Sequence, residues 1–361
     1  MNQRHFVWFL TALLVAAATV SAKKPTWTDP AKAKAEDPDF LLQGEYSGTL
    51  KASSGKTMKV GLQVVALGGG DFRMLPFNGG LPGDGWDGRR KTFVAGKRDA
   101  NNRLTFVSTI SKQEGTVVIA GGQAKVTDPD GKPMGTLQRI ERRSPTLGAK
   151  PPAGAVVLFD GSDVSKWKKG KLTSQKFLAA GTKTKDTFGS FKLHIEFRLP
   201  YKPQTPPSNQ DRGNSGLYHF NRYECQVLDS FGMHYYPNTH PKSEWKQAFK
   251  KEFGYGPQSD RTQWCGSFYK FKTPDINVCY PPLVWQTYDI TFTAPIFEGG
   301  KKTANARFTI LHNGVKIHDD VELKKGTGAG GGRKEVPTEG LYLQGHGNPV
   351  VYRNIWLLPK K

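Results

Sequence analysis

Residues 190–200 read SFKLHIEFRLP, and this stretch decides the fold class of the chain. Its side chains alternate strictly between two kinds. The apolar set, which would face a core, is Phe191, Leu193, Ile195, Phe197 and Leu199. The polar set is Lys192, His194, Glu196 and Arg198. Because successive side chains of a strand point to opposite faces, the pattern predicts a β-strand that packs one face on a core. Taken alone, the polar face is typical of an antiparallel sheet that is open to solvent.

The next strands along the chain place chemically active groups together. Residues 213–220 and 222–230 each read as a strand, and in the second one Arg222, Glu224 and Gln226 share a face. An arginine, a carboxylate and an amide in register suit a ligand that is rich in hydroxyl groups. The arginine would also keep the Glu224 carboxylate ionised, as a base or a metal ligand requires.

The C-terminal stretch GLYLQGHGNPVVYRNIW, residues 340–356, adds a second candidate. It reads as two strands around a glycine-rich turn, with Gln344 and His346 on one face. A histidine flanked by glycines is sterically open, which suits a general acid or base, or a metal ligand. A turn histidine without a role is the open alternative.

The rest of the chain divides into segments of different composition. Short alternating runs separated by glycines and Asp-Gly pairs predict a small antiparallel β domain before residue 144. The stretch SPTLGAKPPAG at 144–154 disfavours regular structure and marks a boundary. The expected organisation is a signal peptide (1–22), a linker (23–43), a small all-β accessory domain (44–143), a second linker (144–154) and a C-terminal β domain (155–361).

The first residues have the features of an export signal. A basic start precedes an apolar run from Phe6 to Val20, and small residues follow it before Lys23. The run is too short to span a bilayer comfortably, and no other run reaches the roughly 20 apolar residues of a transmembrane helix. We therefore expect a periplasmic or secreted protein whose mature chain has no transmembrane segment.

The chain is strongly basic, with 52 Lys and Arg against 31 Asp and Glu and a formal charge of +21. Such a charge invites a nucleic-acid partner, because Lys and Arg neutralise phosphates. The basic residues are spread along the whole chain without a recognition motif, so we expect no nucleic acid. The alternative explanations are a generally basic proteome, or attraction to acidic envelope surfaces and polysaccharides.

The three cysteines are Cys225, Cys265 and Cys279. Cysteines tend to form disulfides in an oxidising compartment. We expect a bridge between Cys265 and Cys279, because both lie in an irregular segment and enclose a loop of moderate length. Cys225 lies inside a strand pattern and is expected to be a small buried hydrophobe.

From residue 155 onward, a succession of motifs resembles one known family. The motifs LFDGSDVSKW (158–167), FKLHIEFRLP (191–200), GNSGLY (213–218), RYECQVLDS (222–230) and LQGHGNPVVYRNIW (343–356) are similar to those of the 3-keto-disaccharide hydrolase domain. The resemblance spans about residues 155–359. It implies a concanavalin-like jelly roll of two antiparallel sheets, with a polar concave face open to a carbohydrate. The expected fold class is therefore all-β, with this β-sandwich preceded by the small antiparallel β domain.

The resemblance also implies a chemistry, the cleavage of glycosides already oxidised to a ketone at C3. The ketone acidifies the C2 hydrogen, so a base can remove it and expel the C1 leaving group, with water added afterwards. Ordinary glycosidases instead use a spaced pair of carboxylates. Glu224 and His346 are the candidates for base and acid, or for ligands of a divalent cation that would polarise the ketone. The residues expected to bind the oxidised glycoside are Arg222, Gln226, Asn214, Asp229, Tyr218, Trp285 and Gln344.

Two other functions stay open at this point. The same fold serves carbohydrate-binding, lectin-like modules that have no catalytic activity. A structural envelope protein, in which both β domains serve association, is the third reading and predicts no stabilisation by a sugar.

Overall fold

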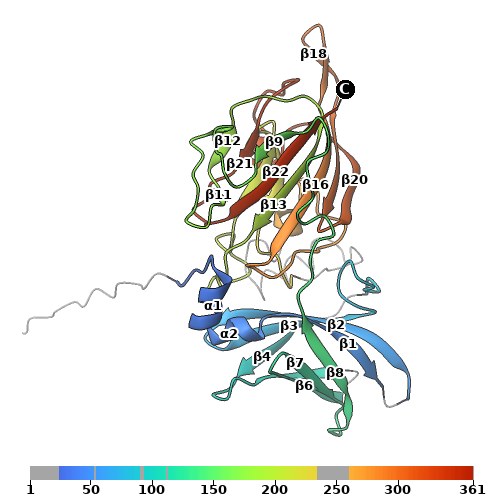
Figure 1. The fold of residues 1–361 in the computed structure, drawn as a ribbon. Coiled ribbons are helices and arrows are strands. Elements are labelled where there is room, and N and C mark those ends of the chain that lie inside the picture. Colours follow the sequence, from blue (N-terminus) through green and yellow to red (C-terminus); the bar gives the residue numbers. More distant parts are fainter. Residues whose placement is uncertain (1–23, 53, 90–92, 111–112, 234–259, 361) are drawn as a thin grey trace, which may run out of the picture.

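The computed structural model of the protein describes residues 24–52, 54–89, 93–110, 113–233 and 260–360. The expected signal peptide, residues 1–22, lies outside these ranges. Strands far outnumber helices in the described chain, and they form a barrel and a sandwich that lie end to end (Figure 1). The predicted all-β fold class is confirmed. Among the described residues, no helix has the length and apolar character needed to cross a membrane.

The N-terminal body is a closed antiparallel barrel of eight strands in sequence order. Its strands are β1 (Gly44–Lys51), β2 (Thr57–Gly68), β3 (Asp71–Asn78), β4 (Val94–Arg98), β5 (Leu104–Ile110), β6 (Gln113–Ala120), β7 (Gln123–Thr127) and β8 (Pro133–Ile140). The barrel closes where β1 pairs with β8, with Glu45 opposite Ile140. Closure leaves no unpaired strand edge, and open edges are the usual route to aggregation of small β domains.

Apolar side chains fill the barrel, as the alternating runs predict. Tyr46, Phe72 and Phe106 are at most 1% exposed, and the Tyr46 hydroxyl donates to the Leu42 carbonyl oxygen at 2.8 Å. Strand β7 follows the two-residue turn at 121–122, where both glycines have positive φ (54° and 77°), a conformation that glycine adopts readily.

The segment 23–43, expected to be a linker, contains two short helices. They are α1 (Pro30–Glu36) and α2 (Pro38–Leu42), and both lie beside the barrel (Figure 1). Each begins with an Asp-Pro pair. The Asp29 carboxylate accepts from the Ala31 N–H at 2.7 Å, and proline is well tolerated at the first helical position. The repeated Asp-Pro pair was therefore a readable helix-start signal.

The C-terminal body is a β-sandwich. Its five-stranded sheet runs, in spatial order, β10 (Trp167–Lys168), β12 (Thr182–Thr184), β21 (Leu341–Leu343), β14 (Ser215–His219) and β15 (Tyr223–Val227). Its seven-stranded sheet contains β11 (Leu178–Ala179), β22 (Val351–Pro359), β13 (Phe191–Arg198), β16 (Trp285–Thr293), β19 (Ala306–His312) and β20 (Val315–Leu323), with β9 (Val156–Phe159) also paired to β22. The hairpin of β17 (Ile296–Glu298) and β18 (Lys301–Ala304) projects from one end, and two 3₁₀ turns lie at Arg261–Gln263 (η1) and Gly328–Gly330 (η2).

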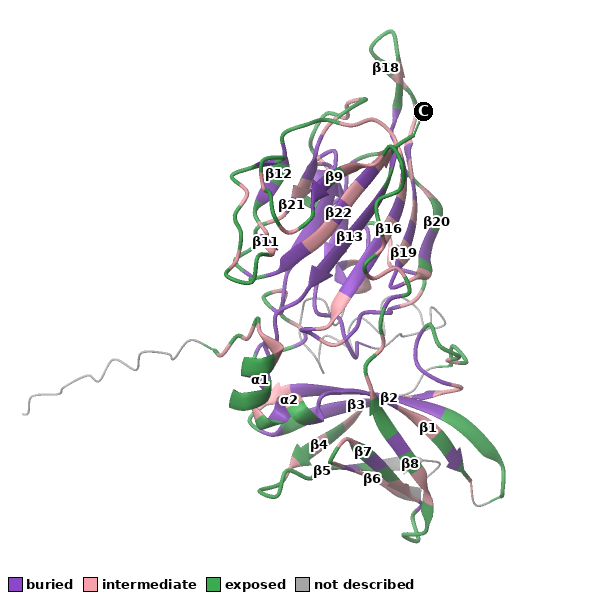
Figure 2. Ribbon diagram, in the orientation of Figure 1, coloured by how far each residue is buried: buried purple, intermediate pink, exposed green. Residues whose placement is uncertain are grey.

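The core lies between the two sheets, where the apolar face of β13 packs. The five apolar side chains predicted for this face are at most 2% exposed, which confirms the strand and its facing. Phe191 packs on Phe292 with ring centroids 5.1 Å apart, and Phe292 on Phe308 at 4.7 Å. Most of β13 is buried on both faces (Figure 2).

The polar face of β13 is covered rather than open to solvent, which corrects the reading of that strand taken alone. His194 and Glu196 are both fully buried. The predicted linker 144–154 lies over them, because the Gly148 N–H donates to Glu196 Oε1 at 2.6 Å. The Ala149 carbonyl oxygen accepts from the Trp356 indole N–H of β22 at 3.0 Å. The linker is irregular, as predicted, but it is fastened to the sheet.

All three cysteines are buried free thiols, so the predicted bridge between Cys265 and Cys279 is absent from the structure. The Cys265 thiol lies 3.1 Å from the Tyr288 hydroxyl, whereas the Cys279 thiol is 3.5 Å from the Tyr280 carbonyl oxygen. The two thiols are also hydrogen-bonded to each other, so they lie together without forming a bridge. Cys225 lies in the core, as expected for a small hydrophobe.

Candidate active site

Glu224 lies on β15, at the edge of the five-stranded sheet, and a tight turn fixes its position. Phe220 and Asn221 both have φ of 54°, and the Arg222 N–H donates to the His219 carbonyl oxygen at 3.0 Å. Two consecutive left-handed residues are the signature of the hairpin turn that matches strand twist. The turn ends the alternation, and strand pairing begins at Tyr223.

Arg222 therefore does not join the row predicted from alternation. Its guanidinium donates to the carbonyl oxygens of Lys334 and Phe220, both at 2.5 Å, and lies 3.8 Å from the Glu339 carboxylate. The prediction that Arg222 keeps Glu224 ionised is wrong. Its side chain fastens the hairpin turn to the segment before β21.

The Glu224 carboxyl group is held by neutral partners. The Tyr218 hydroxyl, from the neighbouring strand β14, is a hydrogen-bond partner of the carboxyl group. The Gln226 amide is oriented so that its nitrogen donates to Glu224 Oε1 at 3.0 Å and to the Ser215 carbonyl oxygen at 3.1 Å. Asn214 lies 3.3 Å from the other end of that amide. Tyr218, Gln226 and Asn214 thus gather around Glu224.

Burial raises the pKa of Glu224 to about 7, and the hydrogen bond from Tyr218 opposes part of this rise. The residue is only 3% exposed. A carboxyl group with a pKa near neutrality exchanges a proton readily at physiological pH, which is what a general base or acid requires. Within the described part of the chain, burial and the neutral Tyr218 set this pKa, so Glu224 is suited to proton transfer for the opposite of the expected reason.

Two glycines lie close against the carboxyl oxygens. A Cβ on Gly216 would lie 2.5 Å from Oε1, and a Cβ on Gly328 would lie 3.1 Å from Oε2. Gly328 belongs to the run GTGAGGG at 326–332, and the Glu224 N–H donates to Thr327 Oγ1 in the same run at 2.8 Å. The sequence reading missed this loop. A glycine run between strands signals close backbone approach, so it could have been found.

A second layer of polar groups extends the cluster. The Asn214 amide lies 3.3 Å from the Gln210 amide, and the Gln210 amide lies 3.0 Å from the Tyr269 hydroxyl and also contacts the Gln263 side chain. On the other side, Gln344 Nε2 donates to the Tyr218 hydroxyl at 3.4 Å, which places Gln344 in the cluster as predicted. The amides and hydroxyls suit hydroxyl-rich ligands.

Three other predicted site residues lie elsewhere. Asp229 is buried in an ion pair with Arg212 at 2.8 Å. Trp285 begins β16 of the opposite sheet and contacts the Phe177 ring at a centroid distance of 4.9 Å. His346 is exposed in the loop after β21. The predicted grouping fails for Trp285 because β14–β15 and β16 belong to different sheets.

A divalent cation held by Glu224 and His346 does not fit this arrangement. Glu224 is buried among neutral donors, whereas His346 is exposed and its carbonyl oxygen accepts from the Asn348 amide at 3.3 Å. Across the described residues, no group of three or more His, Cys, Asp and Glu side chains is placed to hold a metal ion.

Comparison with known proteins identifies the sandwich. The family model of the 3-keto-α-glucoside-1,2-lyase-like domain matches residues 154–358. The chain belongs to this family. The match covers the sandwich of the lyase-like domain and leaves out the barrel, and it includes Glu224 with all the partners described above. The suspected membership in the 3-keto-disaccharide hydrolase family is confirmed.

Two solved structures from Parabacteroides distasonis ATCC 8503, each provisionally named a glycosyl hydrolase, are similar to this chain. The first shares 27% identity over 58% of this chain and 85% of its own, with a TM-score of 0.44. The second shares 16% identity over 58% of this chain and 94% of its own, with a TM-score of 0.40. No curated protein matches the chain. Membership of the family supports a carbohydrate-cleaving activity of the hydrolase or lyase type.

Proposed function

We propose that the lyase-like domain cleaves 3-keto-glycosides by elimination, with Glu224 as the base that removes the C2 proton. The observation that carries the proposal is the buried Glu224 carboxyl group, whose pKa of about 7 leaves a large ionised fraction at neutral pH. The family named for 3-keto-glucoside lyases supports the choice of substrate class.

The reaction balances without a redox partner. Glu224 takes the C2 proton, and the electron pair of the C2–H bond moves onto the C3 carbonyl as an enolate. Return of that pair forms the C1–C2 double bond and breaks the bond from C1 to the leaving oxygen. The leaving oxygen takes a proton, and water then adds across the double bond. Gln226 and Tyr218 hold the carboxyl group in place. His346, exposed two residues after Gln344 of this cluster, is the candidate for protonating the leaving oxygen.

The test is the release of p-nitrophenol from p-nitrophenyl 3-keto-glucoside that carries deuterium at C2. Elimination predicts a slower release than from the unlabelled substrate and loss of the deuterium to water. Direct hydrolysis would leave the label in the sugar. Glu224→Gln should reduce turnover by about a hundredfold to ten-thousandfold, the usual contribution of a general base. Glu322→Gln, at a partly exposed carboxylate on β20, is the matched control.

His346→Gln and added EDTA separate the remaining roles. A loss of turnover in His346→Gln with normal sugar binding supports the acid role, and loss on chelation would establish a metal requirement. Full turnover in both Glu224→Gln and His346→Gln would exclude the proposed residues. Absence of turnover in the wild-type protein, together with thermal stabilisation by a sugar, would favour a carbohydrate-binding module.

A further inference from the structure

A cavity of about 540 Å³ lies at the junction of barrel and sandwich. Its walls come from α1, from the start of β1 and the end of β8 in the barrel, and from the segment 281–285, β13 and β22 in the sandwich. Pockets of about 300–1,000 Å³ are typical of small-molecule sites, which also favour domain interfaces. Nothing in the proposed elimination uses this space.

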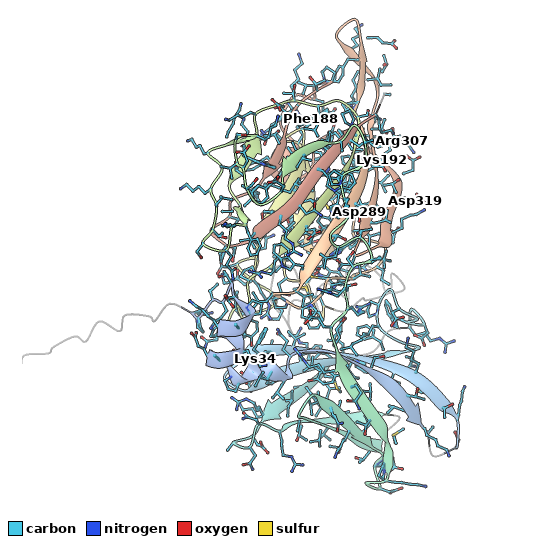
Figure 3. All side chains as sticks on the ribbon, in the orientation of Figure 1. Lys34, Phe188, Lys192, Asp289, Arg307 and Asp319 are labelled. Atoms are coloured by element: carbon cyan, nitrogen blue, oxygen red, sulfur yellow. The ribbon has the colours of Figure 1, made fainter. Side chains whose placement is uncertain are left out.

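Most of the charged side chains that line the cavity are positive. The six cationic side chains at its wall are Lys34, Arg139, Arg142, Arg143, Arg198 and Arg353. Two carboxylates, Glu45 and Glu141, stand against them, a formal excess of four positive charges. Lys34 lies on α1 beside the barrel (Figure 3). Cations gathered in a concave space focus a field that favours an anionic ligand.

The arginines of this cavity differ in how they are neutralised. Arg142 donates to both Glu45 oxygens at 2.6 and 2.7 Å, which fixes it in a bidentate ion pair. Arg139 instead donates to the Gln43 carbonyl oxygen, from two nitrogens at 3.0 and 3.2 Å. Arg198 donates to the Thr28 carbonyl oxygen and to Gln175 Oε1, both at 2.7 Å. Carbonyl and amide oxygens orient these guanidinium groups without cancelling their charge.

Two of these guanidinium groups lie beside the Trp285 ring. The Arg353 guanidinium carbon lies 4.0 Å from the centroid of the Trp285 ring, and that of Arg198 lies 5.1 Å from it. Arg198 is only 6% exposed. Burial, together with the positive charge of Arg353, lowers the pKa of Arg198 below its usual value, partly offset by Asp29. Arg353 is partly exposed and forms an ion pair with the Glu196 carboxylate at 2.7 Å. The buried Arg198 is instead held by two neutral oxygens, and an anion bound beside it would offset the cost of burying its charge.

The remaining wall suits the carbon skeleton of a sugar. Phe40, Leu147, Pro282 and Leu283 contribute apolar surface beside the charged groups. Arginine forks match the planar oxygens of carboxylate and the oxygens of sulfate, whereas the apolar wall can pack on C–H groups of a pyranose ring. We infer that this cavity binds an acidic oligosaccharide, with its carboxylate or sulfate groups on Arg139 and Arg198 and a ring against the apolar wall.

The inference is independent of the proposed elimination, because Glu224 lies on the other sheet. The experiment is calorimetric titration of the full chain at low salt with digalacturonate, a sulfated disaccharide, neutral cellobiose and a single-stranded oligodeoxynucleotide. We expect at least one of the two acidic disaccharides to bind more tightly than cellobiose, and we expect its affinity to fall as salt is added. The carboxylated and sulfated probes then identify which acidic group the site prefers.

Arg139→Gln and Arg198→Gln should each weaken binding by about tenfold to a hundredfold, as loss of a charge-assisted hydrogen bond does. Arg143→Gln gives a variant at an exposed side chain, which keeps the test decisive if Arg198→Gln fails to fold. Arg307→Gln, on the exposed face of β19, is the control and should bind normally. Glu224→Gln should also bind normally.

Three results would overturn the inference. The first is that cellobiose binds as tightly as the acidic disaccharides. The second is that Arg139→Gln and Arg143→Gln both bind the acidic disaccharides with unchanged affinity. The third is that the protein binds the oligodeoxynucleotide more tightly than either acidic sugar.

Discussion

Neutralising His194 should remove a measurable part of the stability of the sandwich. His194 Nδ1 lies 2.6 Å from Asp289 Oδ1, and its Nε2 lies 3.5 Å from Glu196 Oε1. Desolvation of the ring lowers its pKa, but the two carboxylates outweigh it and raise the pKa to about 9. Figure 3 labels Asp289 on the seven-stranded sheet. The protonated imidazole is thus a buried cation between two anions.

The pH dependence of this stabilisation follows from the difference between the pKa of His194 in the folded and unfolded states. A pKa raised from 6.5 to about 9 means that the folded state binds the proton more tightly than the unfolded chain. The contribution is complete below pH 6.5, declines as pH rises toward 9 and is absent above that pH. The difference of about 2.5 pKa units corresponds to about 3 kcal/mol.

Urea unfolding at pH 6 and pH 10 would test this. The free energy of unfolding of the wild-type protein, minus that of His194→Gln, should shrink by about 3 kcal/mol between the two pH values. Subtracting the two free energies of unfolding removes the contribution of groups that titrate alike in both proteins. His346→Gln changes an exposed histidine, so its difference from the wild-type protein should stay the same at both pH values. A difference that stays constant, or an NMR titration that shows a neutral His194 imidazole at pH 7.5, would refute the reasoning.

Further predictions concern the Glu224 cluster and the thiols. Gly216→Ala should lower kcat/KM on a 3-keto-glucoside by at least about tenfold, because the added Cβ would lie 2.5 Å from Glu224 Oε1. Gly189→Ala is the control, since a Cβ at that position would have no heavy atom of a neighbouring residue within 4 Å. The pH profile of kcat/KM should rise through about pH 7 as the Glu224 carboxyl group ionises, and activity independent of pH between 5.5 and 8.5 would contradict the base role. Denatured, unreduced protein should present three reactive thiols to a thiol reagent, whereas a single thiol would reveal a bridge between Cys265 and Cys279.

Alternation predicted the sandwich strands well, because one face of each strand must be buried. The apolar set on β13 and the placement of Gln226 beside Glu224 both follow from it. Alternation did not predict the position of Arg222, because the left-handed residues Phe220 and Asn221 interrupt it just before the strand begins. Local pattern therefore identified the acid group but assigned it the wrong neighbour.

Longer-range features lay beyond what alternation can predict. Whether Trp285 joins Glu224 depends on which sheet each strand enters, and that is decided by pairing across more than 60 residues. The pKa of Glu224 depends on the loop at 326–332, about a hundred residues further along the chain. The covering of His194 by residues 144–154 is likewise a tertiary contact.

The fastened linker has a practical consequence for dissecting the protein. A stretch rich in proline and glycine invites cleavage, and the sequence boundary near residue 150 is the natural place to cut. Here the backbone at Gly148 and Ala149 is engaged by groups of the sandwich. A protease could cleave this segment only after the segment had detached from the sandwich. A sandwich fragment that starts at Gly154 would leave Glu196, Asn354 and Trp356 without these partners. A fragment that keeps these contacts has to begin at about Ser144 rather than at the edge of the family match.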